Sequence, residues 1–318
     1  MPTGTTLATT SITPEMTGTG RRQWRTGYHL RRQLMGFTYT IPIVVFVAVL
    51  FVTPLVLAAR MSLSTWGLLT GPGAFTFPKN FLSISKNQLF WPSVIFTLEY
   101  TVVVTILLLG IGLGLALLVQ MQSRWANLLR TVFLLPVSLG LAAASLLAYG
   151  FFSPVIGPIS PPLMQLGLIH GPIPFLGTPL NALLSTTFLV VWKYAGFYML
   201  VFVVGLQGIS DDVLEAAALD GATPRQTFRY ITLPLLRPSL ALALILCVTG
   251  SLLAFDQFFI LTKGAPNNST VTVVQVIYRE AFQRQNLGTA AALSIIVLVV
   301  LLALNAVQFK FLRGSAGN

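Results

Sequence analysis

The sequence predicts an all-α integral membrane protein with six transmembrane helices and both termini in the cytoplasm. Three observations support this fold class: the composition, the length of the apolar runs and the distribution of basic residues. Of the 318 residues 55% are hydrophobic and only 8% are charged, and the mean hydropathy is +0.81. A soluble domain carries roughly 25% charged residues. The chain therefore has too few charges to cover a water-facing surface.

Six apolar runs are long enough to cross a bilayer, which takes about 20 helical residues. They lie at 37–60, 94–119, 128–152, 181–206, 239–262 and 288–309. The segments after the first, third and fifth runs are rich in Gly, Pro, Asn and Ser, which is typical of loops. The sequence thus predicts a transmembrane domain at 36–312, which includes a polar loop at about 207–238, and a C-terminal tail at 313–318.

A basic segment at 1–35 precedes the first run. Residues 1–20 are rich in Thr and Gly, lack the apolar core of a signal peptide and are predicted to be disordered. The following arginines are interleaved with aromatic residues: Arg21, Arg22, Arg25, Arg31 and Arg32. A nucleic-acid binder would carry such a stripe on a folded soluble face. Directly before a span, it favours contact with anionic membrane lipid and not with nucleic acid.

Basic residues also orient the bundle. Further ones follow the second and fourth runs: Arg124, Arg130, Arg225, Arg229 and Arg237. With the N-terminal arginines and those near the C-terminus they outnumber the basic residues of the other loops. The positive-inside rule then places both termini and the loop at 207–238 in the cytoplasm.

That loop carries local signals for a helix, a turn and a second helix. Residues 213–219 are strong helix formers, Asp212 is predicted to be their N-cap, and Glu215 lies three residues on, as in a capping box. Gly221 follows where a helix end favours positive φ.

Thr223 and Pro224 fit the N-cap and the first turn of the second helix. Leu233 is predicted to end it, because a residue before proline avoids the helical region. A plain connector needs none of these signals, which favours a loop that binds a partner in water.

The loop resembles the EAA loop of bacterial ABC-importer permeases, through EAAALDGA at 215–222, Phe228 and ITLP at 231–234. The matching residues include Glu215, Ala216, Ala217, Asp220, Gly221, Ala222 and Pro234. GLQGIS at 205–210 and FFILTKGAPNNST at 258–270 extend the resemblance to the carbohydrate-uptake permeases. The resemblance covers residues 36–312. It is greatest to the first subunit of the heterodimeric permease pairs of the maltose and glycerol-phosphate type. This chain lacks the extra spans and the external insert of the largest maltose-type subunit, so it resembles the compact six-span form.

The resemblance implies the type I ABC-importer permease fold in a bacterial inner (cytoplasmic) membrane and import by alternating access. The helix at 213–219 would be the coupling helix, which docks on a cytoplasmic ATPase. The implied partners are a second related permease, two ATPase subunits and an extracytoplasmic substrate-binding protein. The chain has no G-x-x-x-x-G-K-[ST] loop. ATP and Mg would therefore be bound by the ATPase subunits, and no cofactor, metal or catalytic site is expected in this chain.

Ionisable and aromatic residues inside the spans are candidates for the substrate path, because charges within a membrane are costly. The candidates are Glu99, Trp192, Lys193, Tyr194, Phe255, Asp256 and Gln257. Lys193 would either bind a sugar hydroxyl or a phosphate, or form an internal ion pair with Glu99 or Asp256.

The sequence thus predicts a permease subunit, not an enzyme, of an ATP-driven, binding-protein-dependent importer for a di- or oligosaccharide such as trehalose or maltose. One alternative has the same architecture and imports glycerol phosphate or a glycerophosphodiester. The other two are a secondary transporter or channel, and a scaffold that recruits a cytoplasmic partner. The residues alone do not select the substrate.

Overall fold

The computed structural model describes residues 40–120 and 123–314. The basic segment predicted at 1–35 lies outside the described residues, as does most of the tail predicted at 313–318. Among the described residues, those up to Leu57 belong to one unit and those from Ala58 to a second, and the packing described below is that of the second unit.

The first predicted span is a continuous helix from Thr40 to Ser62. It contains the π-helical turn η1 (Ala48–Val52) and ends with α2 (Thr53–Ser62). The turn lies just before Pro54, which has no N–H to donate. Thr53 donates both its backbone N–H and its hydroxyl to the carbonyl of Ala48, five residues back. The wider turn therefore lets the helix continue through the proline.

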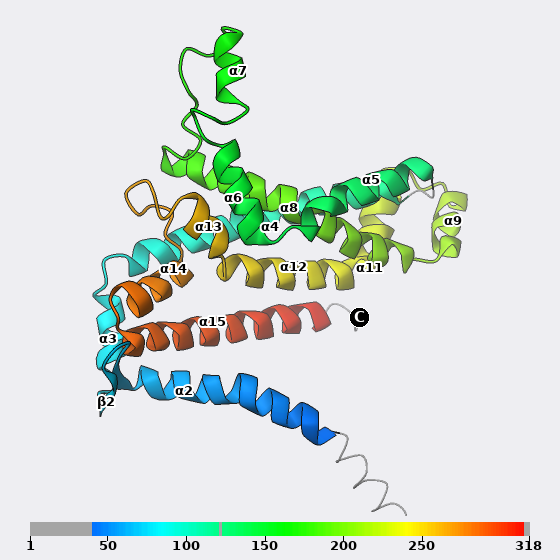
Figure 1. The fold of residues 1–318 in the computed structure, drawn as a ribbon. Helices are drawn as coiled ribbons and strands as arrows, with labels where there is room; N and C mark the ends of the chain where they lie inside the picture. The colour runs from blue at the N-terminus through cyan, green and yellow to red at the C-terminus, as the bar shows by residue number, and fades with distance from the viewer. Residues whose placement is uncertain (1–39, 121–122, 315–318) are drawn as a thin grey trace, which may run out of the picture. The chain divides into compact units, whose positions relative to one another are not determined.

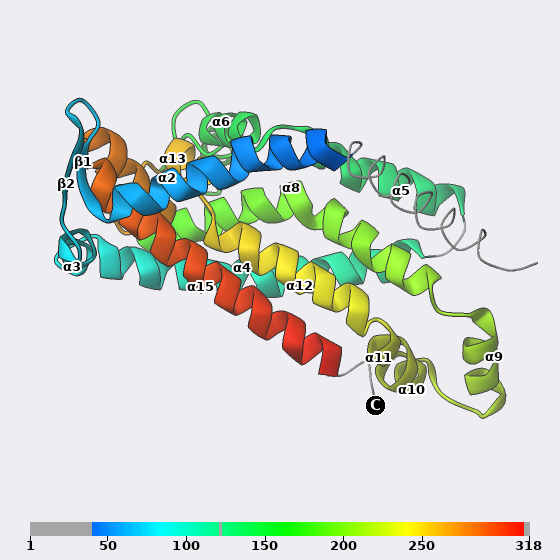
Figure 2. The same ribbon diagram turned by 90° about the horizontal axis from the view of Figure 1, so that it is seen from below.

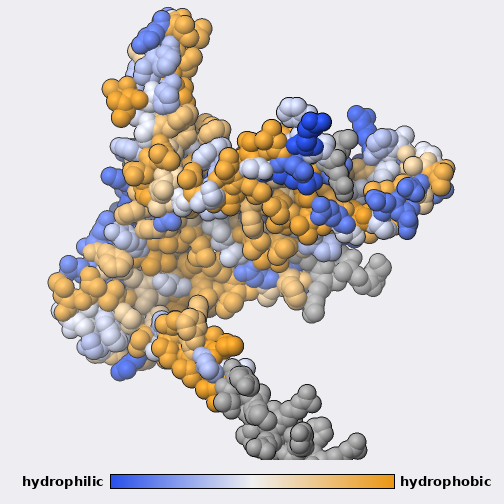
Figure 3. Space-filling model, turned by 45° about the vertical axis from the view of Figure 1, so that its right-hand side comes forward, coloured by the Kyte–Doolittle hydropathy of each residue, from blue (hydrophilic) through white to orange (hydrophobic). Residues whose placement is uncertain are grey.

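Four long helices form the body of the second unit: α4 (Phe90–Val119), α8 (Pro179–Gln207), α12 (Arg237–Leu252) and α15 (Leu287–Gly314). Figures 1 and 2 show them side by side. Apolar side chains cover much of the face seen in Figure 3. Among the described residues, five helices are long and apolar enough to cross a membrane, or six if a bent pair counts as one span. With the pair counted, the number agrees with the prediction.

Helix α8 packs closely on α4 at Gly112. A Cβ there would lie 2.8 Å from the Cβ of Tyr198. Gly110 and Gly114, two residues to either side, face open space. Residues two apart on a helix point in different directions, so the three glycines do not share one face.

The third predicted span, 128–152, is not a single straight helix. It consists of α5 (Arg124–Leu134), the 3-10 turn η2 (Leu135–Ser138) and α6 (Leu141–Phe151), and the chain bends by 95° between them. Pro136 lies in the turn, and the backbone that follows it is extended at Leu139 and Gly140. The helical hydrogen-bond ladder is therefore interrupted in the middle of an apolar segment.

The fifth predicted span is also interrupted. Helix α12 ends at Leu252, and the short helix α13 (Asp256–Leu261) begins after three residues that are not helical.

One end of the second unit carries the only sheet among the described residues. The strands β1 (Ser64–Gly67) and β2 (Gly71–Phe75) form an antiparallel hairpin, a small departure from the all-α prediction. Beside it lies α3 (Lys79–Ser85), whose Asn80 side-chain amide donates to the carbonyls of Ser62 and Ser64 at 2.9 and 2.8 Å. The elements α14 (Val273–Tyr278) and η4 (Arg279–Gln283) lie at the same end. Helix α7 (Ser160–Gln165) lies in the loop after α6.

The opposite end carries α9 (Asp211–Leu219), α10 (Pro224–Thr227), η3 (Phe228–Thr232) and α11 (Leu233–Leu235). Both ribbon views place α9 beyond the ends of α8 and α12. The polar loop predicted from the sequence is thus helical over most of its length.

Candidate functional site

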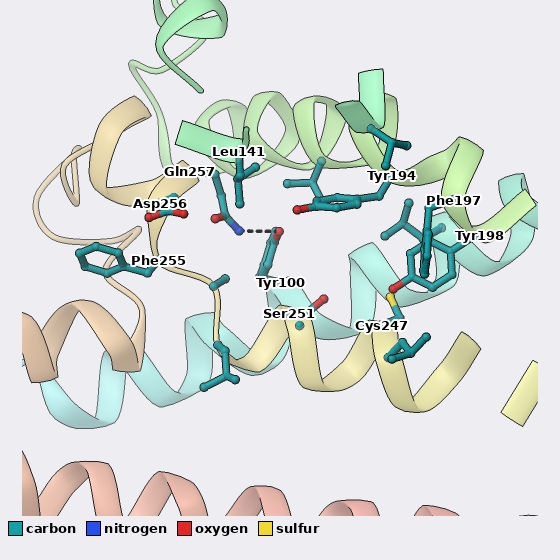
Figure 4. A pocket seen from close by; sticks show the side chains of 17 residues that line it. Tyr100, Leu141, Tyr194, Phe197, Tyr198, Cys247, Ser251, Phe255, Asp256 and Gln257 are labelled. Carbon is teal, nitrogen blue, oxygen red and sulfur yellow. Dashed lines mark hydrogen bonds between the residues drawn. The ribbon is translucent and has the colours of Figure 1, made fainter. Parts of the chain in front are cut away.

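A cavity of about 510 Å³ lies among α4, α8, α12 and the bend between η2 and α6. Its volume is in the range of ordinary ligand sites. Tyr194, Phe255, Asp256 and Gln257, all candidates from the sequence, line it. Three of these, Phe255, Asp256 and Gln257, belong to the segment where α12 gives way to α13. Gln257 points toward Tyr100, whereas Phe255 points away from it and stacks on Phe259 (Figure 4).

Gln257 and Tyr100 form the polar centre of the cavity. The side-chain nitrogen of Gln257 donates to the Tyr100 hydroxyl at 3.1 Å, and in Figure 4 both side chains point into the same space as Tyr194. Gln257 is only 4% exposed, and its Oε1 is buried without a hydrogen-bond partner. An unsatisfied buried acceptor costs about 1–3 kcal/mol. The cavity wall therefore holds a buried acceptor that has no partner among the described residues.

The charge of the cavity comes from one residue. Asp256 is the single acidic side chain in the described lining, and no Lys, Arg or His contributes to that lining. Asp256 is exposed and begins α13. The described part of this wall is thus acidic, with tyrosine hydroxyls and one amide as its other polar groups.

Lys193, for which the sequence left open a solute contact or an internal ion pair, does not line the cavity. It is 3% exposed, and its Nζ donates to the carbonyls of Pro136 and Val137 at 3.4 and 3.3 Å and to that of Leu139. Neither ion pair proposed for it, with Glu99 or with Asp256, occurs in the described part of the chain. These three backbone carbonyls accept from its ammonium group instead, and that of Pro136 also accepts from the backbone N–H of Leu139 at 3.3 Å.

Trp192 and Glu99 also lie away from the cavity. Trp192 is 46% exposed and lines a separate apolar pocket with Phe188 and α6, while Glu99 is exposed on α4. Successive residues of a helix are about 100° apart. Trp192, Lys193 and Tyr194 therefore point in three directions, and only Tyr194 reaches the cavity.

Several residues that line the cavity were not predicted from the sequence, among them Tyr100, Tyr198, Cys247 and Ser251. Helical spacing would have found some of them, since Tyr198 lies one turn after Tyr194 and Ser251 one turn after Cys247. Cys247 lines the cavity while being 2% exposed.

In the loop after α8, some of the predicted helix caps and turns occur and others do not. Gly221 has φ +77°, as predicted, and the N–H of Ala222 donates to the Ala217 carbonyl at 3.0 Å to close the end of α9. Thr223 caps α10, and it forms a capping box with Gln226. The predicted N-cap at Asp212 is wrong, because α9 begins at Asp211 with Ser210 as its N-cap and both aspartates lie in the first turn.

The predicted helix end at Leu233 is also wrong. Leu233 has helical dihedral angles, and its N–H donates to the Phe228 carbonyl five residues back. The π-helical turn η3 thus carries the chain into Pro234, as η1 does before Pro54.

Most residues that match the EAA pattern lie at the surface of the loop. Glu215, Ala216, Asp220 and Gly221 are exposed, and Ala222 and Pro234 are half-buried. Ala217 is the only buried residue of α9. The helix therefore presents an acidic, small-residue surface to the surroundings of the chain.

The chain is similar to a known protein family and to permeases of several transport systems. The family model described as "Binding-protein-dependent transport system inner membrane component" matches residues 106–314. The trehalose/maltose transport system permease MalF of Thermococcus litoralis is 30% identical, over 88% of this chain and 94% of its own length. The glycerol-3-phosphate transport system permease UgpA of Agrobacterium fabrum is 31% identical, over 74% of this chain and 79% of its own.

Solved structures share the fold. A chain of a bacterial ABC transporter that imports the acidic polysaccharide alginate has a TM-score of 0.80 and 21% identity, and the match covers 91% of this chain and 98% of that one. A structure of a bacterial alginate transporter in complex with a periplasmic protein that holds an alginate pentasaccharide has a TM-score of 0.77 and 22% identity, over 91% and 96% of the two chains. With its apolar helices and this family match, the protein is a multi-pass protein of the inner membrane. The chain belongs to the family of inner-membrane permease components of binding-protein-dependent transport systems.

Proposed function

We propose that this permease carries an uncharged di- or oligosaccharide through the cavity among α4, α8 and α12. The observation that carries the proposal is the buried, unpartnered Oε1 of Gln257 beside the hydroxyl of Tyr100. A sugar hydroxyl donates to such an acceptor, and tyrosine and phenylalanine rings offer apolar faces to pyranose rings. Recognition by a few polar groups within an aromatic wall is common for small-molecule sites.

The charges of the cavity favour a neutral sugar over glycerol phosphate or a glycerophosphodiester. A phosphate needs cationic or N–H-rich partners, and the described lining contains no cationic side chain. Lys193, which the sequence offered for that role, is committed to backbone carbonyls. Asp256 adds a negative charge that repels an anion.

The transport step is proposed to require other subunits: a second related permease, two cytoplasmic ATPases that bind ATP and Mg, and an extracytoplasmic binding protein. The exposed acidic surface of α9 supports its docking on an ATPase, and the basic residues near both chain ends support a cytoplasmic position for α9. ATP-driven closure of the ATPases would then act through α9 on α8 and α12, which flank it in sequence and line the cavity.

A substrate panel tests the proposal. The complex that co-purifies with this chain is reconstituted in liposomes with its binding protein, and ATPase stimulation and uptake are measured for trehalose, maltose, glycerol 3-phosphate and a glycerophosphodiester. We expect stimulation by a neutral sugar. Stimulation by the phosphates alone would overturn the substrate class.

A second arm tests the need for ATP. The purified chain alone is expected neither to hydrolyse ATP nor to take up sugar along an ion gradient. Gradient-driven uptake by the chain alone, without ATP, would identify a secondary transporter and contradict the importer mechanism.

A further inference from the structure

The bend of the third span places backbone carbonyls inside an apolar bundle without a regular helical ladder. The chain turns by 95° between the segment Arg124–Ser138 and the helix that begins at Leu141. Within a membrane each unsatisfied carbonyl is costly, so broken helices persist only where neighbouring groups supply donors. The stability of this bend therefore depends on what donates to it.

Lys193 of α8 is a matched donor for the bend. An ammonium group has three N–H donors and no acceptor, and the Nζ of Lys193 donates to three carbonyls, those of Pro136, Val137 and Leu139. It lies 5.0 Å from the centre of the Tyr194 ring, a cation–π distance. The carbonyl dipoles and this ring balance the charge of a side chain that is 3% exposed.

Gly196, one turn further along α8, brings the two backbones together. A Cβ at Gly196 would lie 2.0 Å from the carbonyl oxygen of Phe133 and 2.6 Å from its carbon. Only glycine allows this approach, because the obstacle is backbone and cannot rotate away. Lys193 and Gly196 lie on one face of α8, so one face of one helix contacts both the end of α5 and the turn after it.

We propose that Lys193 and Gly196 are positioning residues that fix the bent third span to α8, so that the two move as one body during transport. The bend contributes Val137 and Leu141 to the cavity wall, and α8 contributes Tyr194 and Tyr198. Fixing the bend to α8 keeps these two walls in register while other helices move. The inference rests on the proposed function in one respect, since it takes the cavity as the path of the solute.

The test compares K193M, which removes the donors, with K193Q, which keeps two N–H donors. All variants, and the parent protein with which they are compared, carry C247S, which removes the only thiol of the chain, and L139C, which places a thiol on the bend. Cys247 lines the cavity and Leu139 does not, so any effect of C247S on transport is common to the parent and the variants. The rate of thiol alkylation reports the exposure of the bend. In K193M we expect alkylation about tenfold faster and sugar taken up per ATP about tenfold lower, with K193Q intermediate.

G196A tests the same contact without a change of charge, and G114A is its matched control, because a Cβ at Gly114 meets open space. We expect G196A to resemble K193M and G114A to resemble the parent protein. Alkylation and coupling unchanged in K193M would overturn the proposal, as would K193Q behaving like K193M. If K193M does not accumulate in the membrane but K193Q does, the result supports hydrogen-bond donation by residue 193 to the carbonyls. If neither variant accumulates, the proposal is refuted. Alkylation is measured without sugar, so it tests the bend even if the proposed substrate is wrong.

Discussion

Gln257 and Tyr100 are 157 residues apart in the sequence and are joined by a hydrogen bond of 3.1 Å. The bond connects the first turn of α13 to α4. It uses one end of the Gln257 amide and leaves the other end, Oε1, buried and unpaired. The pair thus fixes the orientation of a buried, unpaired acceptor, which is the group that we propose contacts the solute.

Replacement of Gln257 by leucine is expected to weaken transport of a sugar about tenfold, chiefly by raising its half-saturating concentration. The reason is that a sugar hydroxyl loses its acceptor, at a cost of about 1–3 kcal/mol in a dry site. The control is Q283A, since Gln283 is exposed and distant in sequence from the cavity lining. Concentration-dependent uptake by the reconstituted complex measures the effect, and an unchanged half-saturating concentration contradicts the assigned role.

Y100F is predicted to act in the same direction but less strongly. It removes the hydroxyl that accepts from Gln257, so the amide is free to rotate, while the ring and its packing against Phe258 at 4.8 Å remain. The same uptake assay measures it. A loss larger than that of Q257L would mean that the tyrosine contacts the solute directly.

Asp256 is expected to set charge selectivity. D256N should leave neutral sugar uptake nearly unchanged and raise the ratio of anionic to neutral uptake about threefold. The effect is modest because the carboxylate is exposed and partly screened. Uptake of glycerol 3-phosphate against maltose at low and high salt measures it. A ratio that does not change at either salt concentration shows that Asp256 does not control the path.

Gly221 is expected to be required for coupling and not for assembly. Its φ of +77° costs a leucine about 1–2 kcal/mol, whereas asparagine tolerates this region. G221L should therefore uncouple ATP hydrolysis from transport in an assembled complex, and G221N should retain most activity. Binding-protein-stimulated ATPase activity and uptake are measured together. Wild-type transport by G221L would show that the turn is not needed.

Glu280 is expected to stabilise the end of the molecule that carries the hairpin. It is 5% exposed, accepts from the Asn87 side-chain amide at 2.7 Å and forms an ion pair with Arg284. E280A leaves both partners unpaired and should lower the free energy of unfolding by about 2 kcal/mol. Thermal unfolding of the purified protein measures the loss. E280Q, which still accepts from Asn87, should lie between E280A and the wild type.

The long apolar runs and the local turn signals could be predicted from the sequence. The positive φ of Gly221 and the N-cap role of Thr223 depend only on residues close to them in the sequence. Both could therefore be predicted without knowledge of tertiary contacts. The side chains of the cavity were harder to choose. Trp192, Lys193 and Tyr194 are consecutive in a helix that is apolar on every side, and hydropathy does not indicate which of them faces inward.

Whether a helix bends or continues at a proline could not be predicted from the neighbouring residues in the sequence. Pro136 accompanies a sharp bend, whereas Pro54 and Pro234 lie in helices that continue, because a π-helical turn precedes each of them. The difference depends on what neighbours supply. At the bend around Pro136 three carbonyls accept from Lys193 of another helix, while Thr53 and Leu233 donate to carbonyls of their own helices.

The separation between α9 and the cavity has an evolutionary consequence. No described residue of the loop from Gly208 to Leu236 contributes to the cavity lining. Substitutions that alter the solute can therefore accumulate in one region while the surface offered to an ATPase stays intact. We expect permeases built on this plan to diversify in what they carry while sharing one ATPase.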